Sequence, residues 1–264
     1  MNIGIIGTGH LGRAVLAGLL RSGACPGKIT VSARTGKTLD RIREEYPGVA
    51  ATTDNRDLVR EADTVIIAVR SQDAAGVLGE LKGTDLSGKT VLSLMAGITI
   101  REIREILGDD RHEYTILRMM PNIGVSLCRG ITGVSCDRDG QEPEPAVDLF
   151  RKMGIVIRLP EEKLENITIC AASGLGFAAF IMKQYMDACN RLFTDDSVGE
   201  EITRRVFEAA IAIAGEEHSS FEKLAEQIST RGGTTEAGIR VLERSGLGKT
   251  LDECFDEAIA RVRK

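Results

Sequence analysis

The first twenty residues constrain the fold more than any other stretch. A short apolar run, Ile3 to Ile6, leads into the sequence Gly7-Thr8-Gly9-His10-Leu11-Gly12, and apolar residues then recur at helical spacing as far as Leu20. Strand, glycine turn and helix in this order predict a dinucleotide-binding turn. The first glycine permits the tight turn, the second lets the backbone approach a pyrophosphate, and the third lets the helix pack closely on the strand. The six residues from Gly7 to Gly12 are therefore candidate cofactor ligands, the alternative being a glycine-rich turn of some other α/β protein.

Further apolar runs alternate with helical segments in the first part of the chain. The run from Asp63 to Val69 is continuously apolar, which is typical of a strand buried on both faces of a parallel sheet. Other strands are expected at residues 28–32, 90–94, 114–118, 131–136 and 155–157, with a helix at about 144–153. This alternation predicts an α/β fold, a Rossmann-like doubly wound sheet that occupies residues 1–160.

From Glu161 to the end of the sequence the pattern is helical, with no convincing strand. The longest helical stretch covers residues 167–192 and is interrupted early by Ser173-Gly174-Leu175-Gly176. Further helices are expected at 200–214 and 221–228, and from about 236 and 251 onward. Residues 161–264 are thus predicted to form an all-helical domain with a dimerisation surface.

Composition excludes several classes of function. A net charge of −5 without a basic cluster argues against a nucleic-acid partner. We find no run of about eighteen apolar residues that would span a membrane, and no signal peptide ahead of the first strand, so a cytoplasmic location without a membrane partner is expected. The six cysteines contain no C-x-x-C pair, and His10, His112 and His218 are isolated, so no metal site is expected.

The end of the second predicted strand, Ser32-Ala33-Arg34-Thr35, occupies the place where this fold binds the adenine ribose. An NAD-preferring site would carry an acidic residue there. Arg34 instead supplies a fork of donors for a 2′-phosphate, to which Ser32 and Thr35 add hydroxyl groups. The sequence favours NADP over NAD, with NAD and an ordinary exposed loop arginine as the alternatives.

Three more segments lie where the carboxyl ends of the strands place a ligand: Ala68-Val69-Arg70-Ser71-Gln72, Met95-Ala96-Gly97 and Arg118-Met119-Met120-Pro121-Asn122. Ala96 and Gly97 are small enough for close passage past a flat ring. Pro121 stiffens its loop, and Asn122 is placed to orient groups near a nicotinamide. Each segment has an alternative as ordinary packing at a strand end.

A second glycine-rich turn, Gly232-Gly233-Thr234-Thr235, occurs in the helical part of the chain. Consecutive glycines that lead into a helix present several free N–H groups, which form a site for a carboxylate. The alternative is a helix-capping turn with a threonine as the N-cap.

Taken together, these motifs resemble those of the pyrroline-5-carboxylate reductases. In chain order the shared features are the first glycine motif, Asp63 to Val69, Ala96-Gly97-Ile98-Thr99, Arg118-x-Met120-Pro121-Asn122, Gly154, Glu161, Thr168, Ser173-Gly174 and Gly232-Gly233-Thr234-Thr235. The resemblance implies that the N-terminal domain binds NADPH and that the helical domain intertwines with a second copy in a homodimer, or in a higher oligomer of dimers. It also implies that the G-G-T-T turn of one subunit closes the active site around a small imino acid, with its amides on the substrate carboxylate.

The resemblance extends to single residues. It places Asn55 near the adenosine end of the cofactor and Thr235, the candidate catalytic residue, near the imine nitrogen. The candidate substrate-binding residues are Ser173, Thr230, Gly232, Gly233, Thr234 and Thr235. The implied reaction is NADPH-dependent reduction of a cyclic imino acid, in the first place 1-pyrroline-5-carboxylate to L-proline.

The sequence departs from the family pattern at several positions. It reads Val69-Arg70-Ser71-Gln72 where the family has V-K-P-Q, and Arg231 stands where a proline precedes G-G-T-T, so two loops lose a stiffening ring. Phe177 replaces the usual tyrosine, and Lys183 a frequent glutamate. These changes keep two alternatives open: a related NADP-dependent imine or 3-hydroxy acid oxidoreductase, and a non-catalytic nucleotide-sensing protein. The hydroxy-acid enzymes use a helix lysine followed four residues later by asparagine, whereas Lys183 is followed by Asp187.

Overall fold

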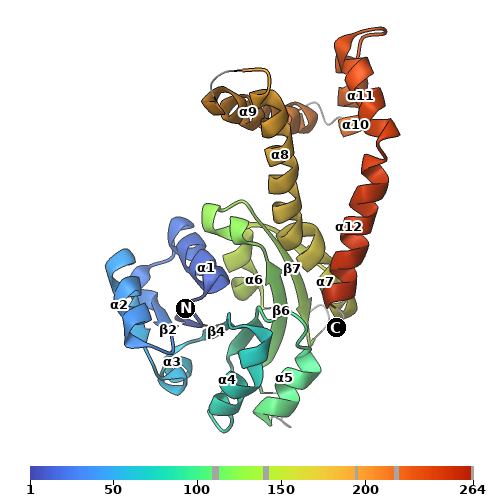
Figure 1. The fold of residues 1–264 in the computed structure, drawn as a ribbon. Helices are drawn as coiled ribbons and strands as arrows, with labels where there is room; N and C mark the ends of the chain where they lie inside the picture. Colours follow the sequence, from blue (N-terminus) through green and yellow to red (C-terminus); the bar gives the residue numbers. More distant parts are fainter. Residues whose placement is uncertain (109–112, 139–142, 194–195, 217–219, 263–264) are drawn as a thin grey trace. The chain divides into compact units, whose positions relative to one another are not determined.

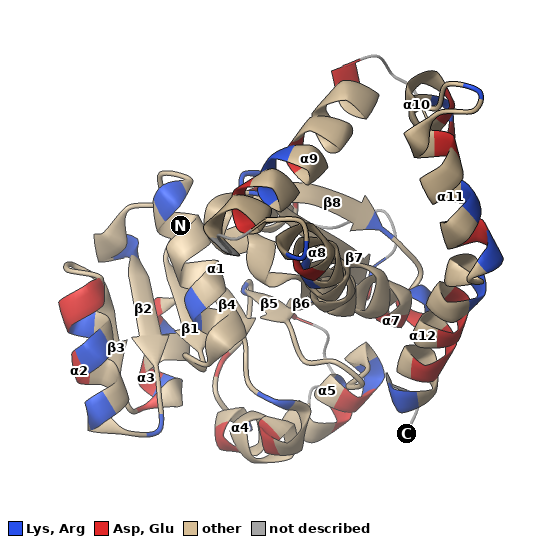
Figure 2. Ribbon diagram, turned by 45° about the horizontal axis from the view of Figure 1, so that its top comes forward, with Lys and Arg blue, Asp and Glu red and all other residues tan. Residues whose placement is uncertain are grey.

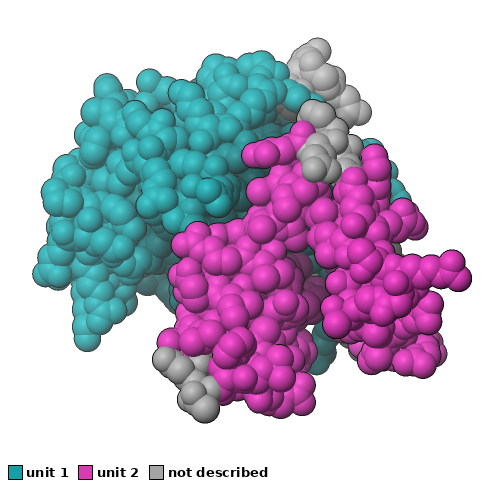
Figure 3. All heavy atoms as spheres, turned by 90° about the horizontal axis from the view of Figure 1, so that it is seen from above, with its two compact units in different colours: residues 1–172, 261–264 teal, residues 173–260 magenta. Residues whose placement is uncertain are grey.

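The computed structural model describes residues 1–108, 113–138, 143–193, 196–216 and 220–262, which excludes His112 and His218 (Figure 1). The chain divides into two compact units, coloured separately in Figure 3. Unit 1 comprises residues 1–172 and 261–264, and unit 2 comprises residues 173–260. The domain boundary proposed from the sequence, between Pro160 and Glu161, remains a prediction.

Unit 1 is built on an eight-stranded sheet in the order β3-β2-β1-β4-β5-β6-β7-β8. All neighbouring strands from β3 to β6 are parallel, β7 is antiparallel to β6, and β8 is parallel to β7. The strands are β1 (Ile3–Ile6), β2 (Ile29–Ser32), β3 (Ala50–Thr52), β4 (Thr64–Ile67), β5 (Thr90–Ser93), β6 (Thr115–Pro121), β7 (Gly130–Cys136) and β8 (Gly154–Arg158). The predicted Rossmann-like sheet is confirmed.

Helices cover both faces of this sheet, and each face has its own apolar core. One core includes side chains of α1 (His10–Arg21), α2 (Gly36–Glu45) and α6 (Glu144–Arg151). The other includes side chains of α3 (Asn55–Glu61), α4 (Ala74–Leu81) and α5 (Ile100–Leu107). Because successive residues of a strand point to opposite faces, Ile5 belongs to the first core and Ile6 to the second. Burial on both sides explains why β1 and β4 are apolar throughout.

Two strands differ from the sequence prediction. The edge strand β3 was not predicted, because Ala50-Ala51-Thr52 is short and lacks a large apolar residue. β6 continues to Pro121, so Arg118 to Pro121 form a strand end and not a loop. The antiparallel partner β7 extends the pairing, with Arg118 opposite Ser135 and Pro121 opposite Thr132.

The chain enters the helical region through α7 (Leu164–Ile167) and a π-helical segment, Thr168–Ser173. Unit 2 then contains α8 (Gly174–Asn190), α9 (Asp196–Glu216), α10 (Phe221–Ile228), α11 (Thr234–Arg244) and most of α12 (Leu247–Val262). The predicted interruption at residues 173–176 is wrong, because the wider π turn carries the chain into α8 without a break. Among the residues described from 161 to 262 there is no strand.

Unit 2 buries little apolar surface in a single chain. An edge-to-face pair, Tyr185 and Phe207, joins α8 to α9 with ring centroids 5.5 Å apart. No residue of α8 is buried, and Phe180 on α8 and Ile211 on α9 are exposed at 64% and 60%. α12, by contrast, carries four acidic residues along its middle, with Lys249 before them and Arg261 after them (Figure 2). An exposed apolar face of this kind marks a surface that a partner covers.

The helical segment from Glu161 to Asn190 is long and apolar enough to cross a bilayer, judged by length and composition alone. The expected absence of a membrane partner therefore stays a prediction. The exposed apolar residues of this segment, such as Phe180, also suit contact with a second protein chain.

Candidate functional site

The three glycines of the first motif have three different environments. Gly7 has a φ of +96°, and a Cβ there would lie 2.8 Å from the carbonyl oxygen of Ala68. A Cβ on Gly12 would lie 2.1 Å from the carbonyl oxygen of Gly7, so no side chain fits between helix and turn. A Cβ on Gly9 would meet nothing within 4 Å. Gly9 thus faces open space, as expected of the residue that a pyrophosphate approaches.

The start of α1 supplies donors for this space. Gly9 is the N-cap and offers no side-chain acceptor. None of the hydrogen bonds among the described residues uses the amides of His10, Leu11 or Gly12. Three free N–H groups at the positive end of a helix dipole form a site for an anion. The residues present therefore fit the pyrophosphate of a dinucleotide.

At the end of β2, two of the three predicted phosphate ligands are already engaged. The buried Ser32 hydroxyl donates to Asn55 Oδ1 at 2.6 Å, and Asn55 Nδ2 donates to Glu80 Oε2 at 2.6 Å. Thr35 is the N-cap of α2, and its hydroxyl oxygen accepts from the Thr38 amide. Ser32 and Asn55, both expected near the adenosine end of the cofactor, form a direct hydrogen bond that the sequence did not predict. Glu80 was missed because nothing local distinguishes it from any other helix-surface glutamate.

Arg34 has a different environment. Its side chain is 79% exposed, and its Nη1 lies 3.6 Å from Asp73 Oδ1. The guanidinium is therefore the predicted 2′-phosphate ligand with the most freedom to bind one.

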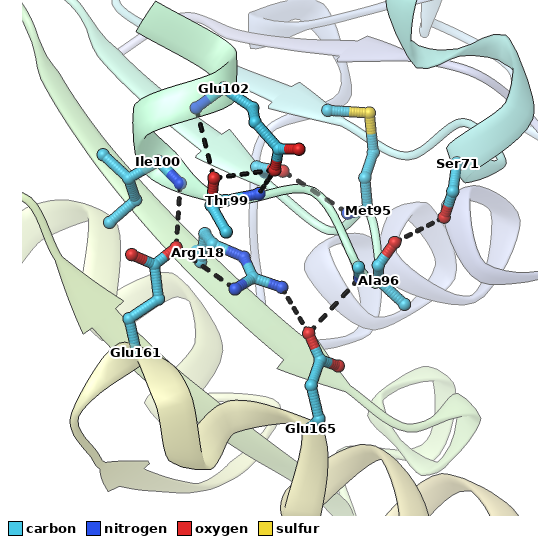
Figure 4. A network of polar contacts seen from close by, with 11 residues as sticks. Ser71, Met95, Ala96, Thr99, Ile100, Glu102, Arg118, Glu161 and Glu165 are labelled. Atoms are coloured by element: carbon cyan, nitrogen blue, oxygen red, sulfur yellow. Dashed lines mark hydrogen bonds and ion pairs between the residues drawn. The ribbon is translucent and has the colours of Figure 1, made fainter. Parts of the chain in front are cut away.

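The loops after β4 and β5 are tied together by a serine. The Ser71 hydroxyl donates to the carbonyl oxygen of Ala96 (Figure 4). Ala68 and Val69 lie between β4 and this serine in the sequence. Ser71 stands where the resembling family has proline. The hydrogen bond restrains a loop that has lost the stiffness of a proline ring.

A buried arginine holds the loop after β5. Arg118 lies on β6 with only 2% of its side chain exposed, and it pairs with two glutamates (Figure 4). Its Nη1 lies 3.1 Å from Glu161 Oε1, and its Nη2 lies 2.7 Å from Glu165 Oε1. The same two oxygens accept from loop amides, Glu161 from Ile100 at 2.8 Å and Glu165 from Gly97 at 3.3 Å. Through these two glutamates, Arg118 fixes the backbone at both ends of residues 97–100.

The far end of that loop is fixed by a capping box. The Thr99 hydroxyl oxygen accepts from the Glu102 amide, and Glu102 Oε2 accepts from the amide and the hydroxyl of Thr99. The hydrogen bonds from Thr99 lower the pKa of Glu102, and the one from its backbone amide has the largest effect. Gly97 itself has a φ of +72°, which favours glycine. Contacts within the protein therefore define the conformation of this loop.

The two glutamates were missed by residue-level reasoning. Glu161 is predicted only as one of the features shared with the family, and Glu165 is not predicted at all. The available signal was Arg118 itself, because a charge in a buried strand requires a partner.

The side chain of Asn122 is hydrogen-bonded to the backbone of the protein on all but one of its positions for a ligand. It is 3% exposed, its Oδ1 accepts from the amides of Gly124 and Ile131 at 3.2 Å each, and its Nδ2 donates to the carbonyl oxygen of Ala171 at 3.0 Å. Pro121, just before it, is buried at the end of β6. Contact of Asn122 with a nicotinamide remains a prediction. The second hydrogen of the Asn122 Nδ2 group would make this contact, since the first bonds to Ala171.

In the G-G-T-T turn of unit 2, the backbone amides without a hydrogen bond are not those expected from the sequence. The Gly232 amide donates to Glu236 Oε2 at 2.7 Å, and the Gly233 amide to the carbonyl oxygen of Thr230 at 2.9 Å. No hydrogen bond among the described residues uses the amides of Thr234, Thr235 or Glu236. The free donors of the turn therefore belong to the first turn of α11 and not to the two glycines.

The conformation of this turn explains both glycines. Gly232 has a φ of +73°, and a Cβ on Gly233 would lie 2.4 Å from the Thr230 hydroxyl oxygen. Gly233, and not a threonine, is the N-cap of α11, so that alternative is wrong. Hydrogen bonding to the Gly232 amide is the main cause that lowers the pKa of Glu236. Ser173 lies apart from this turn in the sequence, at the end of the π-helical segment.

Comparison with known proteins identifies both parts of the chain. Residues 2–97 match the family model described as NADP oxidoreductase, coenzyme F420-dependent, and residues 161–264 match the model for pyrroline-5-carboxylate reductase dimerisation. A solved structure of a pyrroline-5-carboxylate reductase from Coxiella burnetii is 31% identical to this chain, has a TM-score of 0.87, and aligns over 99% of this chain and 97% of its own. This chain belongs to the pyrroline-5-carboxylate reductase family.

Two other relatives agree with the family assignment. A pyrroline-5-carboxylate reductase of Staphylococcus saprophyticus is 27% identical over 99% of this chain and 96% of its own length. A Plasmodium falciparum pyrroline carboxylate reductase, solved with NADP bound, has a TM-score of 0.87 at 18% identity, covers 99% of this chain and 97% of its own, and shows that the fold is shared. In this family the helical region is a dimerisation domain, which accounts for the exposed apolar face of α8 and α9.

Proposed function

We propose that the protein reduces 1-pyrroline-5-carboxylate to L-proline with NADPH. The observation that carries the proposal is a pair of helix starts with free amides, at α1 and at α11. Both reactants are anions, a dinucleotide diphosphate and an imino acid carboxylate, and a helix N-terminus favours each of them. Family membership over the whole length supports the pairing of these two sites in one reaction.

In this proposal the chain mainly positions the reactants. NADPH, when bound, supplies the hydride that adds to the carbon of the C=N bond, while the nitrogen keeps its proton to become the amine of proline. The amides of residues 10–12 hold the pyrophosphate, and the Arg118 network holds residues 97–100 in one conformation. The amides of Thr234 and Thr235 hold the carboxylate, and the Thr235 hydroxyl orients the imine nitrogen. A protonated imine is already electrophilic, so correct placement supplies much of the acceleration.

One observation disfavours a 3-hydroxy acid dehydrogenase. Lys183, the helix residue at which that chemistry would need a free acid or base, forms an ion pair with Asp187 one turn away on α8. The ammonium group is therefore already engaged by a carboxylate on its own helix.

A substrate panel tests the proposal. Purified protein with NADPH and 1-pyrroline-5-carboxylate is expected to oxidise the cofactor, followed by its absorbance, faster than with other cyclic imines or 3-hydroxy acids. NADH in place of NADPH reports the coenzyme preference. Turnover of 1-pyrroline-5-carboxylate no faster than that of a Gly9→Asp variant would remove the assignment, and calorimetric binding of NADPH without turnover of any compound would indicate a nucleotide sensor.

The Glu236 side chain provides a second prediction. Glu236→Ala removes the acceptor that holds the Gly232 amide, so the turn loses its preformed geometry and KM for the imino acid rises about tenfold, with kcat and NADPH affinity unchanged. Glu236→Gln retains an acceptor oxygen and is expected to keep KM near the wild-type value. Glu243→Ala, at an exposed position of the same helix, is the matched control. Equal KM for the alanine and wild-type proteins would show that the hydrogen bond has no part in substrate binding.

A homodimer is the proposed working unit, because the dimerisation domain exposes apolar side chains that a second copy would cover. Light scattering of the purified protein tests this directly, and a monomeric mass would contradict it. Assembly of dimers into a higher oligomer, a cytoplasmic location, and the absence of nucleic-acid and membrane partners remain predictions.

A further inference from the structure

A carboxylate lies between the two arginines of the nucleotide-binding loops. Asp73 closes the short 3-10 helix Ser71–Asp73 that follows β4 and precedes α4. Its Oδ1 lies 3.6 Å from Arg34 Nη1, and its Oδ2 lies 3.6 Å from Arg70 Nε. Both arginines are exposed, at 79% and 71%, whereas the Asp73 side chain is 29% exposed. Two exposed cations that follow two different strands thus lie beside one partly buried anion.

Both cations paired with Asp73 lie near the place where a 2′-phosphate is expected. Arg34 occupies the strand end at which this fold places the adenine ribose. The hydroxyl groups of Ser32 and Thr35, which would assist it, are hydrogen-bonded to Asn55 and to Thr38 of α2. A phosphate at this strand end therefore depends on Arg34, with Arg70 as the nearby second cation. Asp73 already neutralises part of that positive charge.

We propose that Asp73 sets the coenzyme preference of this enzyme by competing with the 2′-phosphate for Arg34 and Arg70. A phosphate bound to Arg34 lies close enough to the Asp73 carboxylate for the two anions to repel each other. NADH has a hydroxyl group at that position and meets neither the competition nor the repulsion. Asp73 therefore lowers the affinity for NADPH and leaves the affinity for NADH unchanged. This inference rests on the proposed function, since it concerns the coenzyme of the same reaction.

Asp73→Asn tests the inference with little change in shape. We expect the Kd for NADPH, measured by calorimetry on the dimeric protein, to fall about three- to tenfold, while the Kd for NADH changes less than about twofold. The gain in NADPH affinity is expected to shrink as salt is added, because exposed charges are screened. Asp148→Asn, which removes one charge from an ion pair on α6, controls for net charge and is expected to change neither constant. Arg34→Met is expected to abolish the preference for NADPH.

Three results would overturn the inference. A weaker Kd for NADPH in Asp73→Asn would mean that Asp73 organises the arginines for the phosphate. Equal changes for NADPH and NADH, with a shifted unfolding temperature, would mean a general effect on the loop, and no change for either would mean that Asp73 plays no part. Each of these leaves the proposed function intact if the wild-type protein still reduces 1-pyrroline-5-carboxylate. Wild-type protein that binds neither coenzyme would instead refute the proposed function.

Discussion

Arg118→Met is expected to lower the free energy of unfolding by about 3 kcal/mol. The substitution leaves Glu161 and Glu165 without the cation that neutralises them, in a site where the arginine is 2% exposed. The estimate lies at the low end for a buried pair, because the two carboxylates are 30% and 25% exposed and retain some hydration. Chemical denaturation followed by circular dichroism measures the change. The affinity for NADPH is expected to fall as well, since the amides of Gly97 and Ile100 lose firmly placed acceptors.

Two further variants separate this effect from simple loss of an arginine. Arg101→Met, on the exposed side of α5, removes a cation that is 84% exposed and lies 3.8 Å from Glu105. Such an exposed ion pair contributes little, so little change in stability is expected. Arg118→Lys keeps the charge but not the two-pronged geometry, so it should recover part of the stability. Wild-type stability in Arg118→Met would contradict the role assigned to the network.

Gly9→Asp is expected to weaken NADPH binding by at least about a hundredfold while the protein stays folded. The new side chain has room, because a Cβ at Gly9 meets nothing within 4 Å. Its carboxylate, however, enters the space in front of the free amides of α1, where the pyrophosphate is proposed to bind. The added anion both occupies the donors and repels the phosphates.

The matched control is Gly27→Asp, which adds the same charge in the short 3-10 helix Pro26–Lys28 ahead of β2, at another glycine with open space around it. It should bind NADPH as the wild type does. Titration of NADPH fluorescence gives the Kd of each protein, and thermal unfolding verifies that both are folded. Unchanged NADPH affinity in Gly9→Asp would place the cofactor elsewhere.

The features that the sequence predicts well are local. The strand, turn and helix of residues 3–20 follow from consecutive residues, and the separate tasks of Gly7 and Gly12 are visible in the close approaches that each makes. The continuous apolar character of β4 likewise predicts its central place in the sheet. In these cases the physical cause and the sequence pattern span the same few residues.

The features that the sequence misses depend on partners far along the chain. Arg118 meets glutamates 43 and 47 residues later, and no local pattern pairs them. Ser32 appears available for a phosphate until the fold brings Asn55 within 2.6 Å of its hydroxyl. The G-G-T-T turn shows the same limit at shorter range, because the Glu236 side chain takes one of the two glycine amides that the pattern assigned to a substrate. Candidate ligand residues can be named from the sequence, but the hydrogen bonds and ion pairs that already occupy their side chains and amides are set by the fold.

The Arg118 network has a consequence for chimaeric enzymes made by exchanging helical regions between relatives. A crossover at the start of the helical region, between Pro160 and Glu161, would take both glutamates from one parent and the arginine from the other. A crossover after Ala172, where the compact unit ends, keeps all three from the same parent. The seam that suits recombination therefore lies inside the helical region, beyond the residues that brace the nucleotide fold.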